Sequence, residues 1–155
     1  METIVGKALA VREHLNEQYI EVLEKDFRDA CVHLHQKKQA VLRLMFAADE
    51  RQIDNSFRIY AVFSIPGLDR FYITVLPLKN GVTAFPSVTP FIPAAHWYER
   101  EIRDMFGLSP DGHPDPRRLV FHDAFPADSH PLRKDWGIAE SDLKEWGEGV
   151  RRKEL

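Results

Sequence analysis

The sequence is poor in the residues that hold metal clusters and nucleotides. Cys31 is the single cysteine among 155 residues, whereas iron–sulfur clusters, structural zinc sites and disulfides need several cysteines, most often at close spacing. The pattern nearest to a dinucleotide-binding loop, Gly147-Glu148-Gly149, has no third glycine at the required place and no strand before it. We therefore expect the chain to hold no conventional cluster and no nucleotide by itself.

Long apolar runs and an excess of one charge are also missing. No run approaches the roughly 18 apolar residues that cross a bilayer, and the N-terminal sequence has charged residues where a secretory signal peptide has an apolar core. The 21 basic and 24 acidic side chains leave a net charge of −3, which is not the basic excess of a nucleic-acid-binding protein. These features predict a protein of the cytoplasm or of the cytoplasmic side of a membrane, with no nucleic-acid partner.

The length of the chain is close to the most common size of a single domain. Apolar residues at helical spacing predict an amphipathic helix over residues 3–15, and a short strand is expected from Tyr19 to Leu23. A second helix is predicted next, because Asp26 and Asp29 resemble a capping signal, although residues 32–35 would also fit a strand. Its buried stripe is expected to contain Phe27, Cys31 and Leu34.

Three segments, residues 40–46, 57–65 and 71–77, are rich in branched and aromatic side chains with period-two alternation and predict three strands. The short segment 66–70 predicts that the last two strands form a hairpin. One face of this pair is expected to be wholly apolar and to carry the helices. We assign to it Phe57, Ile59, Ala61, Phe63 and Ile65 from one strand, and Phe71, Ile73 and Val75 from the other.

A charged helix is predicted over residues 93–106, because Pro93 suits a first helical turn and Gly107 suits a C-terminal stop. Its expected buried stripe is Tyr98, Ile102 and Met105. The helical spacing pairs Glu99 with Arg103 and Arg100 with Asp104. Exposed pairs of this kind contribute only a few tenths of a kcal/mol each, so helix stability cannot be the whole purpose of these charges.

Prolines recur after Gly107, at positions 110, 114, 116, 126 and 131, and exclude a long helix. We call the segment from Ser109 to Trp136 the arm. An extended arm with little core of its own must recover its ordering entropy through contacts, and arginine forks on carboxylates supply such contacts efficiently. The predicted organisation is therefore an α+β domain (residues 1–108), a partner-binding arm (109–136) and a tail (137–155) with a short helix from Ser141.

The polar residues suggest two other uses. Glu99, Glu101 or Asp104 could act as a general acid or base together with His113. The histidines and aspartates of the arm could also hold a metal, although their spacing matches no strong ligand pattern; they are His113, His122, His130, Asp111, Asp115, Asp123 and Asp128. Charged residues at helical spacing more often form a solvated or partner-facing surface.

Two landmarks carry a resemblance to a known family. The first comprises Glu99-Arg100-Glu101, Asp104-Met105-Phe106 and then His113, Arg117, Leu119 and Val120; the second is HPLRKD at 130–135. Together they resemble the signature of the 30-kilodalton subunit of respiratory complex I, the NADH-quinone oxidoreductase. Residues 85–108 and 44–53 look more like the N-terminal part of the large subunit of formate-hydrogenlyase-type, energy-converting nickel–iron hydrogenases.

The resemblance implies a two-layer α+β fold, with a mixed sheet, helices on one face and a proline-rich C-terminal arm that runs along a large catalytic subunit. It also implies that the chain has no catalytic, cofactor-binding or metal-binding residues of its own. Iron–sulfur, nickel–iron or quinone sites would belong to the partner subunits. The expected partners are a 49-kilodalton-type or nickel–iron hydrogenase large subunit and a small iron–sulfur subunit.

The chain then reads as a non-catalytic scaffold of a hydrogenase or NADH-quinone oxidoreductase complex, on the cytoplasmic face of the inner membrane. The alternative is a free-standing enzyme or metal protein that uses Glu99, Glu101, Asp104 and His113. In the scaffold reading those carboxylates fix the helix to the base of the arm through Arg117 or Arg118, or face basic groups on the partner. The signature residues expected at the partner interface are Glu99, Arg100, Glu101, Asp104, His113, Arg117, Arg118, His130, Arg133, Lys134 and Asp135.

Overall fold

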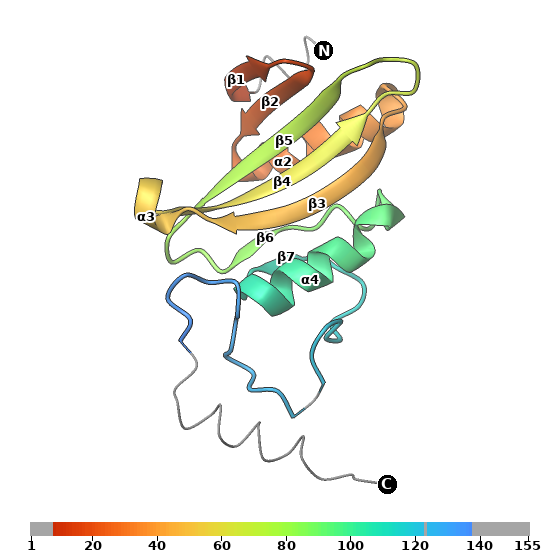
Figure 1. Cartoon of the computed structure of the whole chain (residues 1–155). Coiled ribbons are helices and arrows are strands. Elements are labelled where there is room, and N and C mark those ends of the chain that lie inside the picture. Colours follow the sequence, from red (N-terminus) through yellow and green to blue (C-terminus); the bar gives the residue numbers. More distant parts are fainter. Residues whose placement is uncertain (1–7, 123, 138–155) are drawn as a thin grey trace, which may run out of the picture.

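The computed structural model describes residues 8–122 and 124–137. Its centre is a five-stranded sheet with the strand order β1-β2-β5-β4-β3 (Figure 1). Strands β2 and β5 run parallel, and the other neighbouring pairs are antiparallel, so the sheet is mixed, as predicted. The strands are β1 (Ala8–His14), β2 (Glu17–Val22), β3 (Val41–Asp49), β4 (Ser56–Ser64) and β5 (Phe71–Lys79).

The N-terminal prediction of a helix over residues 3–15 is wrong for its described part. Residues 8–14 form the edge strand β1, which pairs with β2 through a turn where Leu15 has a φ of 52°. The apolar residues at helical spacing are not a buried stripe, because the side chain of Leu15 is 87% exposed. Residues 1–7 lie outside the described residues, and the strand predicted near Tyr19 is confirmed as β2.

Strands β3, β4 and β5 confirm the three predicted strands, and β4 and β5 form the predicted hairpin. The face assigned to β5 was wrong. The register pairs Ala61 with Thr74 and Ile59 with Leu76, which places Phe71, Ile73 and Val75 on the opposite face. Both faces of β5 are apolar, so alternation within the strand could not reveal which one meets the helices.

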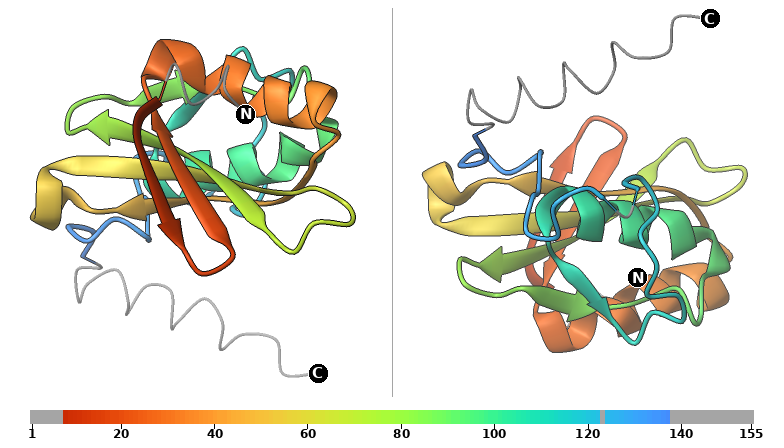
Figure 2. Two further views of the ribbon diagram at one scale, coloured as in Figure 1. Left: turned by 90° about the horizontal axis from the view of Figure 1, so that it is seen from above. Right: turned by 90° about the horizontal axis from the view of Figure 1, so that it is seen from below.

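Helices form a second layer over one face of the sheet (Figures 1 and 2). Helix α2 (Glu24–Val32), extended by a π-helical turn (His33–Lys37), packs on β5, whereas α4 (His96–Phe106) packs along β3. The short helix α3 (Arg51–Asp54) joins β3 to β4. The two-layer α+β prediction is therefore confirmed.

The predicted stripe of α2 is confirmed, since Phe27, Cys31 and Leu34 are fully buried. Burial raises the pKa of the Cys31 thiol, as expected for a cysteine that acts as a small hydrophobic residue. The predicted capping signal is wrong: α2 begins at Glu24, and Leu23 at its N-cap makes no side-chain capping bond.

A small parallel pair of strands, β6 (Ala84–Pro86) and β7 (Ser109–Asp111), brackets α4 in the chain. It brings the start of the arm back beside the segment that precedes α4. Strand β7 also packs against α4. Within the described residues, no helix is long and apolar enough to cross a membrane.

Candidate functional site

Helix α4 carries charged side chains into the interior of the protein. The helix predicted over residues 93–106 begins as a 3-10 turn at Pro93–Ala95, continues as α4 from His96, and stops as predicted at Gly107, which has a left-handed φ of 68°. The predicted stripe is only partly right: Ile102 is buried, while Tyr98 and Met105 pack at the margin of the core. The exposed fractions of the charged residues are 0% for Glu99, 7% for Arg100 and 5% for Asp104. Because a buried charge is unfavourable without partners, each must be bonded to something nearby.

The carboxylate of Glu99 holds the segment that leads into α4. One oxygen, Oε2, accepts hydrogen bonds from the hydroxyls of Ser87 at 2.6 Å and Thr89 at 2.7 Å. The other, Oε1, accepts the backbone N–H of Val88 at 2.6 Å. Both oxygens are thereby satisfied inside the chain. Arg28 of α2 donates from Nε to the carbonyl of Ser87 at 2.9 Å, which ties the same segment to the other helix.

The guanidinium of Arg100 holds the arm. It donates from Nε to the carbonyl of Arg117 at 3.0 Å and from Nη2 to that of Arg118 at 2.8 Å. Its Nη1 lies 3.3 Å from the carboxylate of Asp115. Arg103, three residues further along the helix, also donates to the carbonyl of Arg117. Two arginines of α4 therefore bind the main chain of the arm.

Asp104 holds the following residues of the arm. Its Oδ2 accepts the backbone N–H groups of Leu119 at 2.8 Å and Val120 at 2.9 Å. The geometry resembles a helix cap in which one carboxylate receives two successive amides, and charge-assisted bonds of this kind are the stronger class. Arg100 and Asp104 of the first landmark therefore hold the arm. The predicted alternative gave this task to Glu99, Glu101 and Asp104, and of these three only Asp104 binds the arm among the described residues, while Glu99 binds residues 87–89.

The prediction that arginines such as Arg117 and Arg118 make this connection was wrong. The contacts from α4 go to the main chain of these residues, not to their side chains. Arg117 pairs instead with Asp115 at 2.7 Å, and this bond holds the pKa of Asp115 well below its usual range. Arg118 donates to the carbonyls of Phe125 and Pro126 further along the arm.

The predicted ion pairs within the helix, Glu99 with Arg103 and Arg100 with Asp104, do not form either. The partners of Glu99 lie in the segment before α4, and those of Arg100 lie in the arm. Arg103 is 3.7 Å from its neighbour Asp104. Tertiary contacts outweigh the local pairs because they satisfy groups that are otherwise buried without a partner.

The second landmark, residues 130–135, caps the C-terminal end of α4. The last carbonyls of a helix have no donor within the helix. Here each accepts a hydrogen bond, the first from Gly107, which follows the helix, and the other three from the second landmark. The acceptors and donors are Arg103 O with Gly107 N (2.8 Å), Asp104 O with His130 Nδ1 (3.0 Å), Met105 O with Leu132 N (3.2 Å) and Phe106 O with Arg133 Nε (2.6 Å). The left-handed φ of Gly107 favours glycine, and a Cβ there would lie 2.4 Å from His130 Nε2, so a larger residue would also displace side chains that cap the helix.

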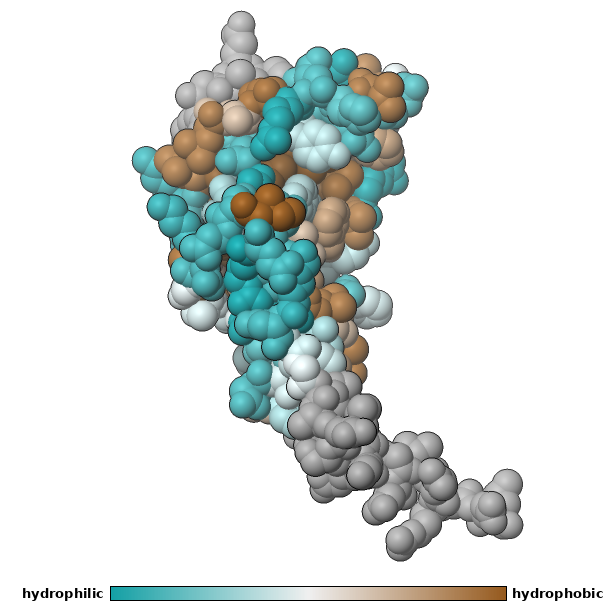
Figure 3. Space-filling model, turned by 60° about the vertical axis from the view of Figure 1, so that its left-hand side comes forward, coloured by the Kyte–Doolittle hydropathy of each residue, from teal (hydrophilic) through white to brown (hydrophobic). Residues whose placement is uncertain are grey.

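The end of the second landmark is bound to the sheet. The backbone N–H of Lys134 donates to Asp49 at 2.9 Å, and Asp135 receives two bonds from Arg51 at 2.6 and 3.0 Å. Arg51 also binds Asp49, and this bond holds the pKa of Asp49 far below its usual range. The surface on the α3 side is largely hydrophilic, with separate hydrophobic patches (Figure 3). The sequence analysis did not identify Asp49 and Arg51, because they are far from the arm in the chain and no local pattern indicates that they bind it.

His113, the suggested partner of a general acid or base, has a structural role here. Its Nε2 donates to the carbonyl of His96 at 3.2 Å, and its Nδ1 accepts the backbone N–H of Asp115 at 3.0 Å. Nε2 also lies 4.0 Å from Glu99. Both side chains are buried with their polar atoms engaged, so neither presents a free atom to a substrate. Among the described residues, which leave out Asp123, no group of three or more His, Cys, Asp or Glu side chains could hold a metal ion.

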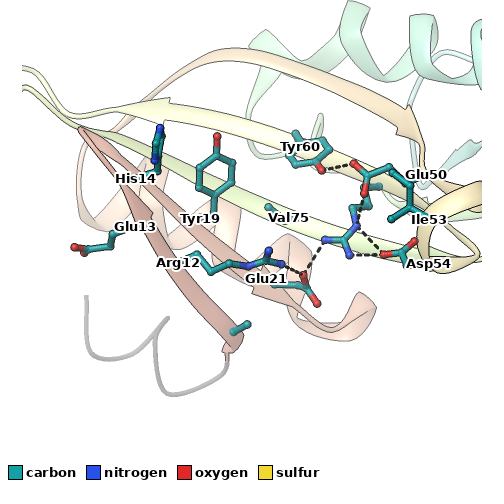
Figure 4. Close-up of a pocket in the computed structure, with 12 residues that line it drawn as sticks. Arg12, Glu13, His14, Tyr19, Glu21, Glu50, Ile53, Asp54, Tyr60 and Val75 are labelled. Atoms are coloured by element: carbon teal, nitrogen blue, oxygen red, sulfur yellow. Dashed lines mark hydrogen bonds and ion pairs between the residues drawn. The ribbon is translucent and has the colours of Figure 1, made fainter.

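A second charged cluster lies on the face of the sheet that α2 and α4 leave uncovered (Figure 4). Arg58 of β4 pairs with Glu21 at 3.0 Å, with Glu50 at 2.9 Å and with Asp54. The hydroxyl of Tyr60 donates to Glu50 at 2.8 Å, and burial together with this bond raises the pKa of Tyr60 to about 12. These side chains line a hollow of about 510 Å³. Their charges are directed mainly at one another.

Comparison with known proteins shows which family the sequence matches. The sequence model of the family described as "Respiratory-chain NADH dehydrogenase, 30 Kd subunit" matches residues 20–142. The chain is 45% identical over 108 residues to "Hydrogenase-4 component G" of Escherichia coli (strain K12), covering 69% of this chain and 20% of that protein. It is 41% identical over 91 residues to "NADH-ubiquinone oxidoreductase 30.4 kDa subunit, mitochondrial" of Neurospora crassa, covering 58% of this chain and 31% of that protein.

The chain thus spans about a fifth to a third of the lengths of these two relatives. A similar fold occurs in the solved "Structure of the membrane-bound sulfane sulfur reductase (MBS), an archaeal respiratory membrane complex". The TM-score is 0.72 at 20% identity, over 99% of this chain and 92% of the matched chain. At that identity the likeness concerns the fold alone.

Proposed function

The chain belongs to the family of the respiratory-chain NADH dehydrogenase 30 Kd subunit, and from this premise we propose that it is a non-catalytic scaffold subunit of a membrane-associated oxidoreductase complex. The complex is a hydrogenase or an NADH-quinone oxidoreductase, since relatives with both kinds of name match the chain. The proposed partners are the large catalytic subunit and a small iron–sulfur subunit. Redox centres would belong to those partners, and this chain would sit at the cytoplasmic face of the membrane through the complex.

One observation carries the proposal: the buried charges of α4 are used to hold other parts of the same chain. Glu99 binds the segment before the helix, while Arg100 and Asp104 bind the main chain of the arm. Catalytic acids and bases must instead reach a reacting group through a free polar atom. A set of charges that fixes the path of a proline-rich arm supports a preformed docking surface, because ordering the arm before binding lowers the entropy lost on association.

The experiment is purification of the chain, tagged at its own locus, from its native organism. We expect a complex that contains a large subunit and iron–sulfur proteins, with hydrogenase or NADH-quinone oxidoreductase activity. The same chain expressed alone should contain no stoichiometric metal by elemental analysis and should catalyse neither reaction. A stoichiometric metal in the isolated chain, or a chain that purifies alone from its native organism, would contradict the proposal and favour the enzyme or metal-protein alternative.

A further inference from the structure

Glu101 differs from the other carboxylates of the signature. It lies between Glu99 and Asp104 in sequence, yet its side chain is exposed to solvent whereas theirs are buried. Within the described residues, its carboxylate has no hydrogen-bond or ion-pair partner. The first landmark of the signature therefore contains two carboxylates that are satisfied internally and one that is free.

The surroundings of Glu101 are apolar. It lines a hollow of about 760 Å³ together with Pro93, Trp97 and Leu119. It also lines a smaller hollow of about 130 Å³ between α4 and β3, together with Phe46 and Leu132. Among the residues that line these two hollows, all of them in the described part of the chain, Glu101 is the single carboxylate.

Trp97 and Glu101 are four residues apart in α4 and therefore lie on the same face of the helix. Trp97 is 68% exposed, and Leu132 is 54% exposed beside the second hollow. An exposed tryptophan bordered by other apolar side chains is typical of a contact surface. We call the surface formed by Trp97, Glu101 and Leu132 the outer face of α4.

A partner that covers this face must deal with the free carboxylate. Burying it without a counter-charge would be strongly unfavourable, so the partner needs to bring a cation to the position of Glu101. Arginine suits this place better than lysine, because its planar guanidinium can bind a carboxylate with two hydrogen bonds and stack on an indole ring at the same time.

We propose that the outer face of α4 is a docking surface for an apolar segment of the large subunit that carries an arginine, which pairs with Glu101 and stacks on Trp97. This inference rests on the proposed function and specifies the chemistry of the partner. It separates two tasks within one helix: the buried charges fix the arm, and the free charge recognises the partner.

The test uses the complex purified from the native organism through the tagged chain. Glu101→Arg is expected to reduce recovery of the large subunit by about 30-fold or more, the effect of placing like charges at a desolvated pair. Glu101→Gln should have a smaller effect in the same direction. The control is Asp69→Arg, which reverses an exposed carboxylate in the turn between β4 and β5 and should leave recovery unchanged. Both Glu101 variants should keep the thermal midpoint of the isolated chain, because the carboxylate has no described partner.

A cross-linking experiment identifies the occupant. Trp97→p-benzoylphenylalanine, irradiated in the assembled complex, should cross-link to a large-subunit segment that contains an arginine. Changing that arginine to glutamate in the Glu101→Arg background should restore assembly.

Several outcomes would overturn the inference while leaving the proposed function intact. They are normal recovery of the large subunit with Glu101→Arg, cross-links from position 97 only to a second copy of this chain, and a lowered thermal midpoint of the isolated Glu101→Arg chain. If the unmodified chain recovers no large subunit, the proposed function itself fails.

Discussion

The two charged clusters of this protein differ in what they bind. On the inner side of α4, Glu99, Arg100 and Asp104 bind mainly to N–H, O–H and C=O groups of distant segments. On the uncovered face of the sheet, Arg58 binds carboxylates, and the cluster closes on itself (Figure 4). Charges bound to a main chain fix the route of that chain, whereas charges bound to one another mainly fix their own positions.

The difference also affects how much each cluster contributes to stability. A buried carboxylate that accepts backbone amides leaves those amides without partners when it is removed, and each unsatisfied group is unfavourable by about 1–3 kcal/mol. Partly solvated ion pairs contribute much less, because water and salt replace or screen the lost partner. The following substitutions test this contrast.

The largest effect is expected for Glu99. Glu99→Ala removes the acceptor of Ser87 Oγ, Val88 N and Thr89 Oγ1, and should lower the free energy of unfolding by about 3–5 kcal/mol. Urea unfolding followed by circular dichroism measures the change. Glu99→Gln keeps the size of the side chain and should recover only part of the loss. If the free energy of unfolding of Glu99→Ala is nearly that of the wild type, the hydrogen bonds of the buried carboxylate do not stabilise the fold.

The second-largest loss of stability is expected for Asp104, and its effect on hydrogen exchange should be confined to the arm. Asp104→Ala should lower the free energy of unfolding by about 2–4 kcal/mol, because two charge-assisted bonds to backbone amides are lost. Hydrogen exchange at the amides of Leu119 and Val120 should also accelerate, while the amides of β4 stay protected. Uniform acceleration over the whole sheet would show instead that the arm and the domain unfold as one unit.

Asp49 provides a test through pH. Its pKa is lowered chiefly by the hydrogen bond from Arg51, so its contribution should be complete above the unfolded pKa of about 4 and be lost as the pH falls towards the lower folded value. We expect Asp49→Asn to be less stable than the wild type at pH 7, and the gap to shrink below about pH 4. Denaturation curves of both proteins across this range measure the gap. A gap that widens on acidification would contradict this assignment.

The smallest effect is expected on the uncovered face of the sheet. Arg58→Gln should lower the free energy of unfolding by about 1 kcal/mol or less, since its partners stay partly solvated. Protection of the arm amides in hydrogen exchange should not change. A loss as large as that of Asp104→Ala would remove the proposed distinction between the two clusters.

The sequence predicted the elements whose signals are local. Strands β3 to β5 follow from alternation, and α4 follows from Pro93 at its start and Gly107 at its end. Strand β1 was missed because an exposed edge strand buries few side chains, so its sparse apolar residues also fit a helical period. The faces of β5 depend on the register of its pairing, which a strand that is apolar on both sides does not encode.

The sequence identified most residues of the candidate site but not the partners that they bind. The resemblance to a known family marked the charged residues of α4 and residues 130–135 as important. Local helix rules then paired Glu99 with Arg103, whereas its actual partners lie 10 to 12 residues away in the chain. Asp49 and Lys134 are 85 positions apart, and their contact follows only from the packing of β3 against α4.

Helix α4 holds residues 117–120 through their main chain, not through their side chains. The helix contacts the C=O groups of Arg117 and Arg118, which every amino acid supplies, and the N–H groups of Leu119 and Val120, which every amino acid except proline supplies. Replacing the side chains of Leu119 and Val120 should therefore alter what the arm offers to a neighbour without rerouting it, whereas the side chains of Arg117 and Arg118 also bind other parts of the arm. Related chains could diversify at Leu119 and Val120 to suit different assemblies, and a designed library at these positions would keep a constant backbone.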